Sequence, residues 1–241
     1  MKNHLLTSGL IALLLALTAC TGATVPVNDD VSDDTTAMSD GEDAPAGMIY
    51  YDLNDMIEEG TKSITTAHVE TIIEKKGTTE VTTGVVDYTD QDNPEFDIVK
   101  EGVVSSSERI IQADGYMYAS YGNATPAQLS GSDLNPLMYD VDLSRAAHDA
   151  IYGMVDPLDG VQPTVTFVGE EQLDGQAVQH YNVTGKQVYK KDEPQAVLDI
   201  WFNASGQPIK FVFQEQDATT TCAYTQLGEP VTIEAPADFY A

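Results

Sequence analysis

The chain is short of positive charge. It has 11 lysine and arginine residues against 39 aspartate and glutamate residues, which gives a formal net charge of −28 at pH 7. Nucleic-acid binding depends on many Lys and Arg contacts to phosphates, and anionic lipid headgroups are held by clusters of basic residues. The composition therefore argues against a nucleic-acid partner and against a polybasic membrane contact. The acidic balance also favours solubility of the folded domain.

Cysteine is scarce as well, with only Cys20 and Cys222 in the whole chain. Cys222 lies in the run TTTCAYT, which is typical of a strand and has no basic neighbour that would activate a thiol. We therefore interpret Cys222 as a buried structural thiol and not as a nucleophile. If Cys20 is modified, as its surroundings indicate below, no intrachain disulfide can form.

The motifs that carry common enzyme chemistry are missing. The sequence has no Gly-x-Ser-x-Gly elbow, no phosphate-binding Walker loop and no dinucleotide-binding glycine pattern. After the N-terminal segment, the histidines are His68, His148 and His180, which are far apart and fall on different predicted elements. Each is expected to be solvent-exposed or to cap a helix. The sequence thus predicts no catalytic residue, no metal site and no cofactor, and we expect that the chain is not an enzyme.

The N-terminus carries an apolar run from Leu5 to Leu17. A membrane-spanning helix needs about 20 apolar residues, whereas the apolar core of a secretory signal needs about 7–15. The next residues, Leu17-Thr18-Ala19-Cys20, resemble the bacterial lipobox. That resemblance implies that residues 1–19 are a lipoprotein signal peptide and that Cys20 becomes a lipidated N-terminus carrying diacylglyceryl and palmitate-like chains. Two acyl chains at one residue give stable membrane anchoring.

Residues 20–47 are rich in Asp, Thr, Ser, Gly and Ala, and they contain no aromatic and no basic residue. Low hydrophobicity combined with charge of one sign is typical of disorder, and self-repulsion extends such a linker. We expect a disordered acidic tether over 20–47, followed by a single domain over 48–241. That length is enough for a domain with a substantial core.

The domain is predicted to be of the α+β class. Apolar residues recur at helical spacing over 49–64 and again over 143–155, where Pro157 follows. The rest is rich in β-branched and aromatic residues, with turns marked by Gly77, Asp114-Gly115 and Asp174-Gly175. Strands joined by short turns are antiparallel. We therefore expect a large antiparallel sheet of about eight to ten strands with two or more helices on one face.

One strand is apolar on both faces, since residues 198–202 read LDIWF. Burial on both sides explains such a pattern, but so does a cavity for an apolar ligand on one side, and the sequence leaves both interpretations open. The candidate cavity residues are the bulky side chains on central strands and on the apolar face of the 143–155 helix: Val85, Ile98, Tyr118, Ile151, Phe167, Trp201, Phe211 and Phe213.

Four stretches together resemble the LppX/LprG-type envelope lipoproteins of actinobacteria, which are related in fold to the LolA and LolB lipoprotein carriers. They are the lipobox at Cys20, the run NDMIEEGTKSITTAHVETI, the hairpin VTFVGEEQLDGQAVQHYNVTG, and LDIWFNASGQPIKFVFQEQ followed by LGEPVTIEAPAD. The resemblance implies a curved, half-barrel antiparallel sheet with helices packed on its concave face and a cavity between them. Some members of that family carry acylated lipids toward the outer envelope.

These observations predict a lipid-anchored protein on the extracytoplasmic face of the cell membrane, in a Gram-positive actinobacterium. The first hypothesis is that it binds or carries a lipid or another apolar ligand in a cavity between sheet and helices. Its partners would be that ligand, the membrane through the acyl chains, and an envelope transporter. The alternative is a non-catalytic envelope interaction or sensor module whose core is filled.

Overall fold

The computed structural model describes residues 48–102, 105–129, 142–190, 192 and 194–239. The predicted signal peptide (1–19), the lipidation site Cys20 and the predicted tether (20–47) lie outside these residues. Within them, no helix is both long enough and apolar enough to cross a membrane.

The described residues form eleven strands and two helices, in an α+β arrangement. In chain order they are α1 (Tyr50–Lys62), β1 (Thr66–Lys75), β2 (Thr78–Asp87), β3 (Glu95–Gly102), β4 (Ser105–Ala113), β5 (Tyr116–Tyr121), β6 (Ala127–Gln128), α2 (Leu143–Tyr152), β7 (Thr164–Leu173), β8 (Gln176–Lys186), β9 (Gln195–Asn203), β10 (Pro208–Glu215) and β11 (Ala218–Thr225).

All eleven strands belong to one antiparallel sheet with the order β6-β5-β4-β3-β2-β1-β11-β10-β9-β8-β7. The first six strands meander from the middle of the sheet to one edge, and the last five meander back from the other edge. The two halves meet where β1 pairs with β11, with His68 opposite Thr225. The connection that contains α2 therefore has to cross from one edge of the sheet to the other.

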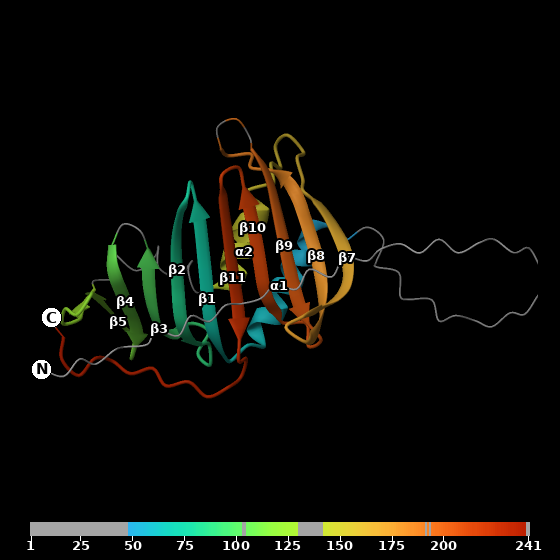
Figure 1. Cartoon of the computed structure of the whole chain (residues 1–241). Coiled ribbons are helices and arrows are strands. Elements are labelled where there is room, and N and C mark those ends of the chain that lie inside the picture. The colour runs from blue at the N-terminus through green and yellow to red at the C-terminus, as the bar shows by residue number, and fades with distance from the viewer. Residues whose placement is uncertain (1–47, 103–104, 130–141, 191, 193, 240–241) are drawn as a thin grey trace, which may run out of the picture. The chain divides into compact units, whose positions relative to one another are not determined.

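Both helices lie against the same face of the sheet (Figure 1). α1 packs on α2, β7 and β10, and α2 packs on β9 and β10. We call the helix-covered side the inner face and the other side the outer face. The predicted fold class, a large curved antiparallel sheet with helices on one face, is confirmed.

Each helix follows from local sequence features. α1 buries Tyr50, Leu53 and Ile57, which recur at helical spacing. Its start is held by the Ile49 N–H, which donates to Asp52 Oδ2 at 3.0 Å. α2 begins after the cap residue Asp142, whose side chain accepts a hydrogen bond from the Arg145 N–H. α2 ends at Tyr152, earlier than the predicted residue 155.

The predicted hairpin turns are confirmed. Asp114 and Asp174 both have a positive φ, as do the glycines that follow them. Such backbone favours Gly, Asn and Asp. These turns join β4 to β5 and β7 to β8.

Most of the core lies on the inner face. It contains fully buried side chains from both halves of the sheet and from both helices, among them Leu53, Ile57, Ile98, Ile110, Leu143, Ile151, Leu198, Ile200 and Phe202. On β9 the alternation is regular: Leu198, Ile200 and Phe202 are buried, while Asp199 and Trp201 are partly exposed on the outer face. The outer face of this strand is therefore not covered by a second layer.

A smaller cluster lies on the outer face, on β4 and β5. Ile111, Ala113 and Tyr118 are buried there against Ile233 and Ala235 from the segment after β11. Figure 1 shows this C-terminal segment running across to β4 and β5. The segment thus covers apolar side chains that would otherwise be exposed.

Candidate ligand-binding groove

A hollow of about 310 Å³ lies between α2 and the inner face of the sheet. We call it the α2 groove. The residues that line it come from α2, β1, β10, β11 and the β8–β9 connection: Thr71, Ile73, Ala146, Asp149, Ala150, Gln187, Lys190, Phe211, Phe213, Glu215 and Thr220.

Small side chains on α2 leave this space open. Ala146 and Ala150 lie one helical turn apart and face the groove. Phe211 and Phe213 alternate with Val212 along β10 and so lie on the same face of the sheet. Alanines on the helix and aromatic rings on the strand therefore form the apolar part of the groove.

The start of the β8–β9 connection is hydrogen-bonded to the end of α2 beside the groove. The buried Gln187 side chain donates from Nε2 to the Ala150 carbonyl oxygen at 3.5 Å. The Val188 N–H donates to the Gly153 carbonyl oxygen at 2.9 Å. A Cβ atom at Gly153 would lie 2.5 Å from Gln187 Oε1, so a larger residue there would displace the Gln187 side chain.

An ion pair lies at the rim of the groove. Lys190 Nζ contacts both carboxylate oxygens of Glu215, at 2.7 and 2.6 Å. The Glu215 side chain is only 13% exposed, whereas that of Lys190 is 54% exposed. The ion pair therefore connects the β8–β9 connection to the end of β10.

The eight residues predicted from the sequence to line a cavity fall into three groups. Phe211 and Phe213 line the α2 groove. Ile98, Ile151 and Phe167 belong to the inner-face core. Val85, Tyr118 and Trp201 lie on the outer face. Their place follows from the alternation of side chains along each strand and from the residues that they contact or pair with. Ligand contact by Phe211 and Phe213 stays a prediction, and the three outer-face residues do not reach the groove.

A buried pair of tyrosines holds the start of α2 on the sheet. The Tyr88 and Tyr224 hydroxyls are 2.8 Å apart, and the Leu143 N–H donates to the Tyr224 hydroxyl oxygen at 2.9 Å. Burial raises the pKa of both phenols, so they are neutral and act as hydrogen-bonding groups. The Tyr224 side chain on β11 thus accepts a hydrogen bond from the first turn of α2, the helix that lines the groove.

Replacing Tyr224 by phenylalanine is expected to lower the free energy of unfolding by about 1–3 kcal/mol, because buried polar groups lose a hydrogen-bond partner. Tyr88→Phe is the matched control, since it leaves the bond between the Leu143 N–H and Tyr224 in place. Urea unfolding of both variants is the measurement. Equal losses would show that the bond to α2 contributes nothing of its own.

Asp142, next to these tyrosines, is the cap of α2. Burial raises the pKa of its carboxyl. The folded domain therefore binds this proton more tightly than the unfolded chain does, so the free energy of unfolding falls as pH rises from the ordinary aspartate pKa through the raised one.

Asp142→Asn is expected to stabilise the domain at neutral pH and to give no gain in acid, because asparagine still caps the helix but has no charge to bury. Thermal unfolding from about pH 4 to about pH 8 measures this difference. A gain that stays constant across that range would contradict the assignment to the Asp142 charge.

A second hollow, of about 340 Å³, lies where the end of α1 approaches the start of α2. It is lined mostly by polar and charged residues: Glu58, Thr61, Lys62, Tyr88, Gln91, Asp92, Pro94, Asp142 and Ser144. A further hollow of about 380 Å³ is lined by polar residues around the β2–β3 connection, and one of about 350 Å³ is lined by polar and small residues where β7, β8 and β9 adjoin the β9–β10 turn. Such linings favour water over an apolar ligand, so the α2 groove is the better candidate.

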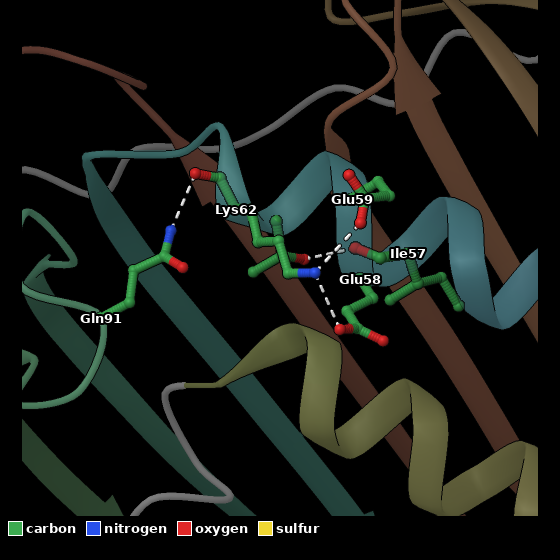
Figure 2. A network of polar contacts seen from close by, with 6 residues as sticks. Ile57, Glu58, Glu59, Lys62 and Gln91 are labelled. Carbon is green, nitrogen blue, oxygen red and sulfur yellow. Dashed lines mark hydrogen bonds and ion pairs between the residues drawn. The ribbon is translucent and has the colours of Figure 1, made fainter.

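Figure 2 shows the polar network at the end of α1. Lys62 Nζ lies 2.9 Å from Glu58 Oε1 and 3.0 Å from Glu59 Oε1. Its hydrogen bond and its positive charge lower the pKa of the Glu58 carboxyl. Gln91 Nε2 donates to the Lys62 carbonyl oxygen at 2.8 Å. These contacts fix the β2–β3 connection against α1, and they leave the cation already paired.

The outer face carries a cluster that the sequence did not reveal. His180 contacts Glu171 through Nδ1 at 3.1 Å and Asp199 through Nε2 at 2.9 Å, and its ring stacks on Trp201 with the ring centres 4.5 Å apart. Its side chain is 14% exposed. The expectation of an exposed or capping histidine is therefore wrong for His180. For His148, whose side chain is 49% exposed, it is confirmed.

Cys222 is buried, as predicted. Among the described residues, no group of three or more His, Cys, Asp or Glu side chains is placed to hold a metal ion. The arrangement of the α2 groove, with an apolar floor and a polar rim, is suited to non-covalent binding.

Comparison with solved structures identifies the fold. The chain is similar to LprF from Mycobacterium bovis, with a TM-score of 0.53 and 14% identity over 80% of this chain and 100% of that one. Lipoprotein LppX from Mycobacterium tuberculosis gives a TM-score of 0.41 at 13% identity, covering 75% and 95% of the two chains. The MucA/MucB complex of Pseudomonas aeruginosa gives 0.45 at 17% identity, covering 77% and 62%.

No family model and no curated protein sequence matches the chain. The likeness to LprF extends over the whole of that protein. It agrees with the single antiparallel sheet and the two helices on its inner face. The chain therefore has the LppX/LprG-type fold.

Proposed function

We propose that the protein is a lipid-anchored, extracytoplasmic lipoprotein that binds or carries a lipid or another apolar ligand in the α2 groove. The observation that carries the proposal is the hollow of about 310 Å³ between α2 and β10. This volume is at the lower end of the range for small-molecule sites, about 300–1,000 Å³. A single apolar chain fits that size better than a large branched lipid.

Binding would rest on apolar area removed from water, at roughly 25 cal/mol per Å². Phe213 is only partly buried and lines the groove, so a ligand chain would cover its ring. Polar groups at the rim would hold the ligand's polar end near Lys190 and Glu215. No bond is made or broken in this process, so the proposal includes no catalytic residue.

Native mass spectrometry tests the proposal. Residues 42–241 include the whole described core, which makes them a suitable fragment. We expect a stoichiometric apolar molecule to co-purify, or to bind on incubation with lipids extracted from the source membrane. A clean apo mass in both cases would overturn the proposal and favour the alternative, a non-catalytic interaction or sensor module.

The proposed anchoring follows from the sequence alone. We propose a lipoprotein signal peptide over 1–19, lipidation of Cys20, a tether over 20–47 and the binding domain over 48–241. The tether would hold the groove away from the membrane surface, within reach of an envelope transporter. The host would be an actinobacterium, as the resemblance to LppX/LprG-type lipoproteins implies.

Replacing Cys20 by serine is expected to move the protein from the detergent phase to the aqueous phase in detergent phase partition of whole cells. The wild-type protein carries acyl chains that contribute about 0.8 kcal/mol per buried CH₂. Cys222→Ser is the matched control, and it should stay in the detergent phase. If both variants partition like the wild type, Cys20 is not the anchor.

A further inference from the structure

The charges around the α2 groove are unbalanced. Among the described residues that line it, Asp149 and Glu215 are acidic and Lys190 is the only cation. Both oxygens of the Glu215 carboxylate are within 2.7 Å of Lys190 Nζ. The positive charge of Lys190 is therefore already paired. Asp149 adds a second carboxylate at the rim, with its Oδ1 3.8 Å from Nδ1 of the half-exposed His148.

This arrangement is unfavourable for an anionic headgroup. A phosphate or carboxylate at the rim would compete with Glu215 for Lys190 and would lie near Asp149, whose side chain is 51% exposed. The excess of acidic residues over the whole chain adds a repulsive field at longer range. By contrast, Thr220 and Gln187 also line the groove, and hydroxyl and amide groups can hydrogen-bond an uncharged polar headgroup.

We propose that the α2 groove selects amphiphiles whose polar end is uncharged or positively charged and discriminates against anionic ones. The inference rests on the proposed function and narrows its ligand class. It assigns Asp149 and Glu215 as the residues that determine headgroup charge, with the apolar chain lying on Phe211 and Phe213.

Three probes with the same tail test this selectivity: dodecylamine, glycerol monolaurate and laurate, each below its micelle concentration. Titration calorimetry of residues 42–241 is expected to show laurate binding about tenfold more weakly than the other two at low ionic strength. The difference in affinity should decrease with added salt, because part of it comes from long-range electrostatic repulsion, which salt screens. Equal affinity for all three probes would overturn the charge selection but leave the proposed function standing. If no probe binds, the proposed function itself fails, and this inference fails with it.

Two variants locate the selectivity in the groove. Asp149→Asn with Glu215→Gln removes two carboxylates and releases Lys190, so laurate affinity is expected to rise about tenfold while glycerol monolaurate affinity stays the same. Asp149→Asn alone, at a half-exposed position, should give part of the gain without disturbing the ion pair.

The control is Asp114→Asn with Asp174→Asn, which makes the same change in net charge at two hairpin turns. Both positions have a positive φ, which asparagine tolerates well. Laurate binding should stay at the wild-type level in this control. If laurate affinity rises as much in the control as in the groove variant, the selectivity is a property of net charge, and the assignment of Asp149 and Glu215 is wrong.

Discussion

Truncating Phe211 to alanine is expected to lower the free energy of unfolding by about 3–5 kcal/mol. Phe211 is 2% exposed and belongs to the inner-face core. It lies between Ile200 on β9 and Cys222 on β11 in the sheet register, and both of these neighbours are also buried. Removing the ring leaves a cavity that this closely packed environment fills only in part.

Phe213→Ala is expected to behave differently, although it lies two residues along the same strand. Its ring is only partly buried and faces the α2 groove, so less packing is lost in the empty domain. We expect its stability cost to be less than half that of Phe211→Ala, together with a loss of affinity for an apolar ligand. On the proposed function, a bound ligand would supply the contacts on that side of the ring.

Urea unfolding, with unchanged m values, measures the stability difference between these variants. Phe167→Ala is a matched control. Phe167 is also partly buried and packs on the core, with its ring centre 5.1 Å from that of Tyr181, but it does not line the groove. It should cost stability and leave ligand affinity unchanged. If Phe213→Ala proves as destabilising as Phe211→Ala and leaves binding intact, Phe213 is a core residue.

The local elements were predictable because they depend on near neighbours. Helical spacing in α1 and α2 and the Asp-Gly turns are properties of a few consecutive residues. The end of α2 coincides with a tertiary contact, because the Gly153 carbonyl oxygen accepts a hydrogen bond from the Val188 N–H of the β8–β9 connection. The prediction of eight to ten strands missed the very short β6, which has only two residues.

Assigning faces from the sequence was harder. In LDIWF both sets of alternating residues are apolar. The pattern therefore does not show that Ile200 lies on the inner face, or that Trp201 lies on the outer face against His180. One step of register moves every side chain to the other face. The same ambiguity placed Val85 and Tyr118 among the cavity candidates.

The groove itself depends on contacts between distant segments. β1 is the first strand of the domain and pairs with β11, the last strand. Lys190, from the β8–β9 connection, contacts Glu215 at the end of β10. Small residues on α2 were visible in the sequence, but small residues are equally compatible with a closely packed helix. The empty space appears only once the helix, both sheet halves and the β8–β9 connection are in place.

Filling that space is therefore the most direct test of its role. Ala146→Trp is expected to reduce affinity for glycerol monolaurate by at least about tenfold, because the indole would occupy the volume that the ligand chain needs. Ala146 is partly exposed and lines the groove, and it is not among the fully buried residues of α2. Its enlargement should consequently disturb the core less than a change at Ala147 would.

The matched control is Ala124→Trp, which adds the same side chain at an exposed position after β5, away from the residues that line the groove. It should bind the probe as the wild type does. Circular dichroism and urea unfolding confirm that both variants fold, and calorimetry then compares their affinities. Since the tryptophan blocks only the space beside α2, undiminished binding in a folded Ala146→Trp domain would place the ligand in another hollow. A loss restricted to Ala146→Trp would identify the α2 groove as the binding site.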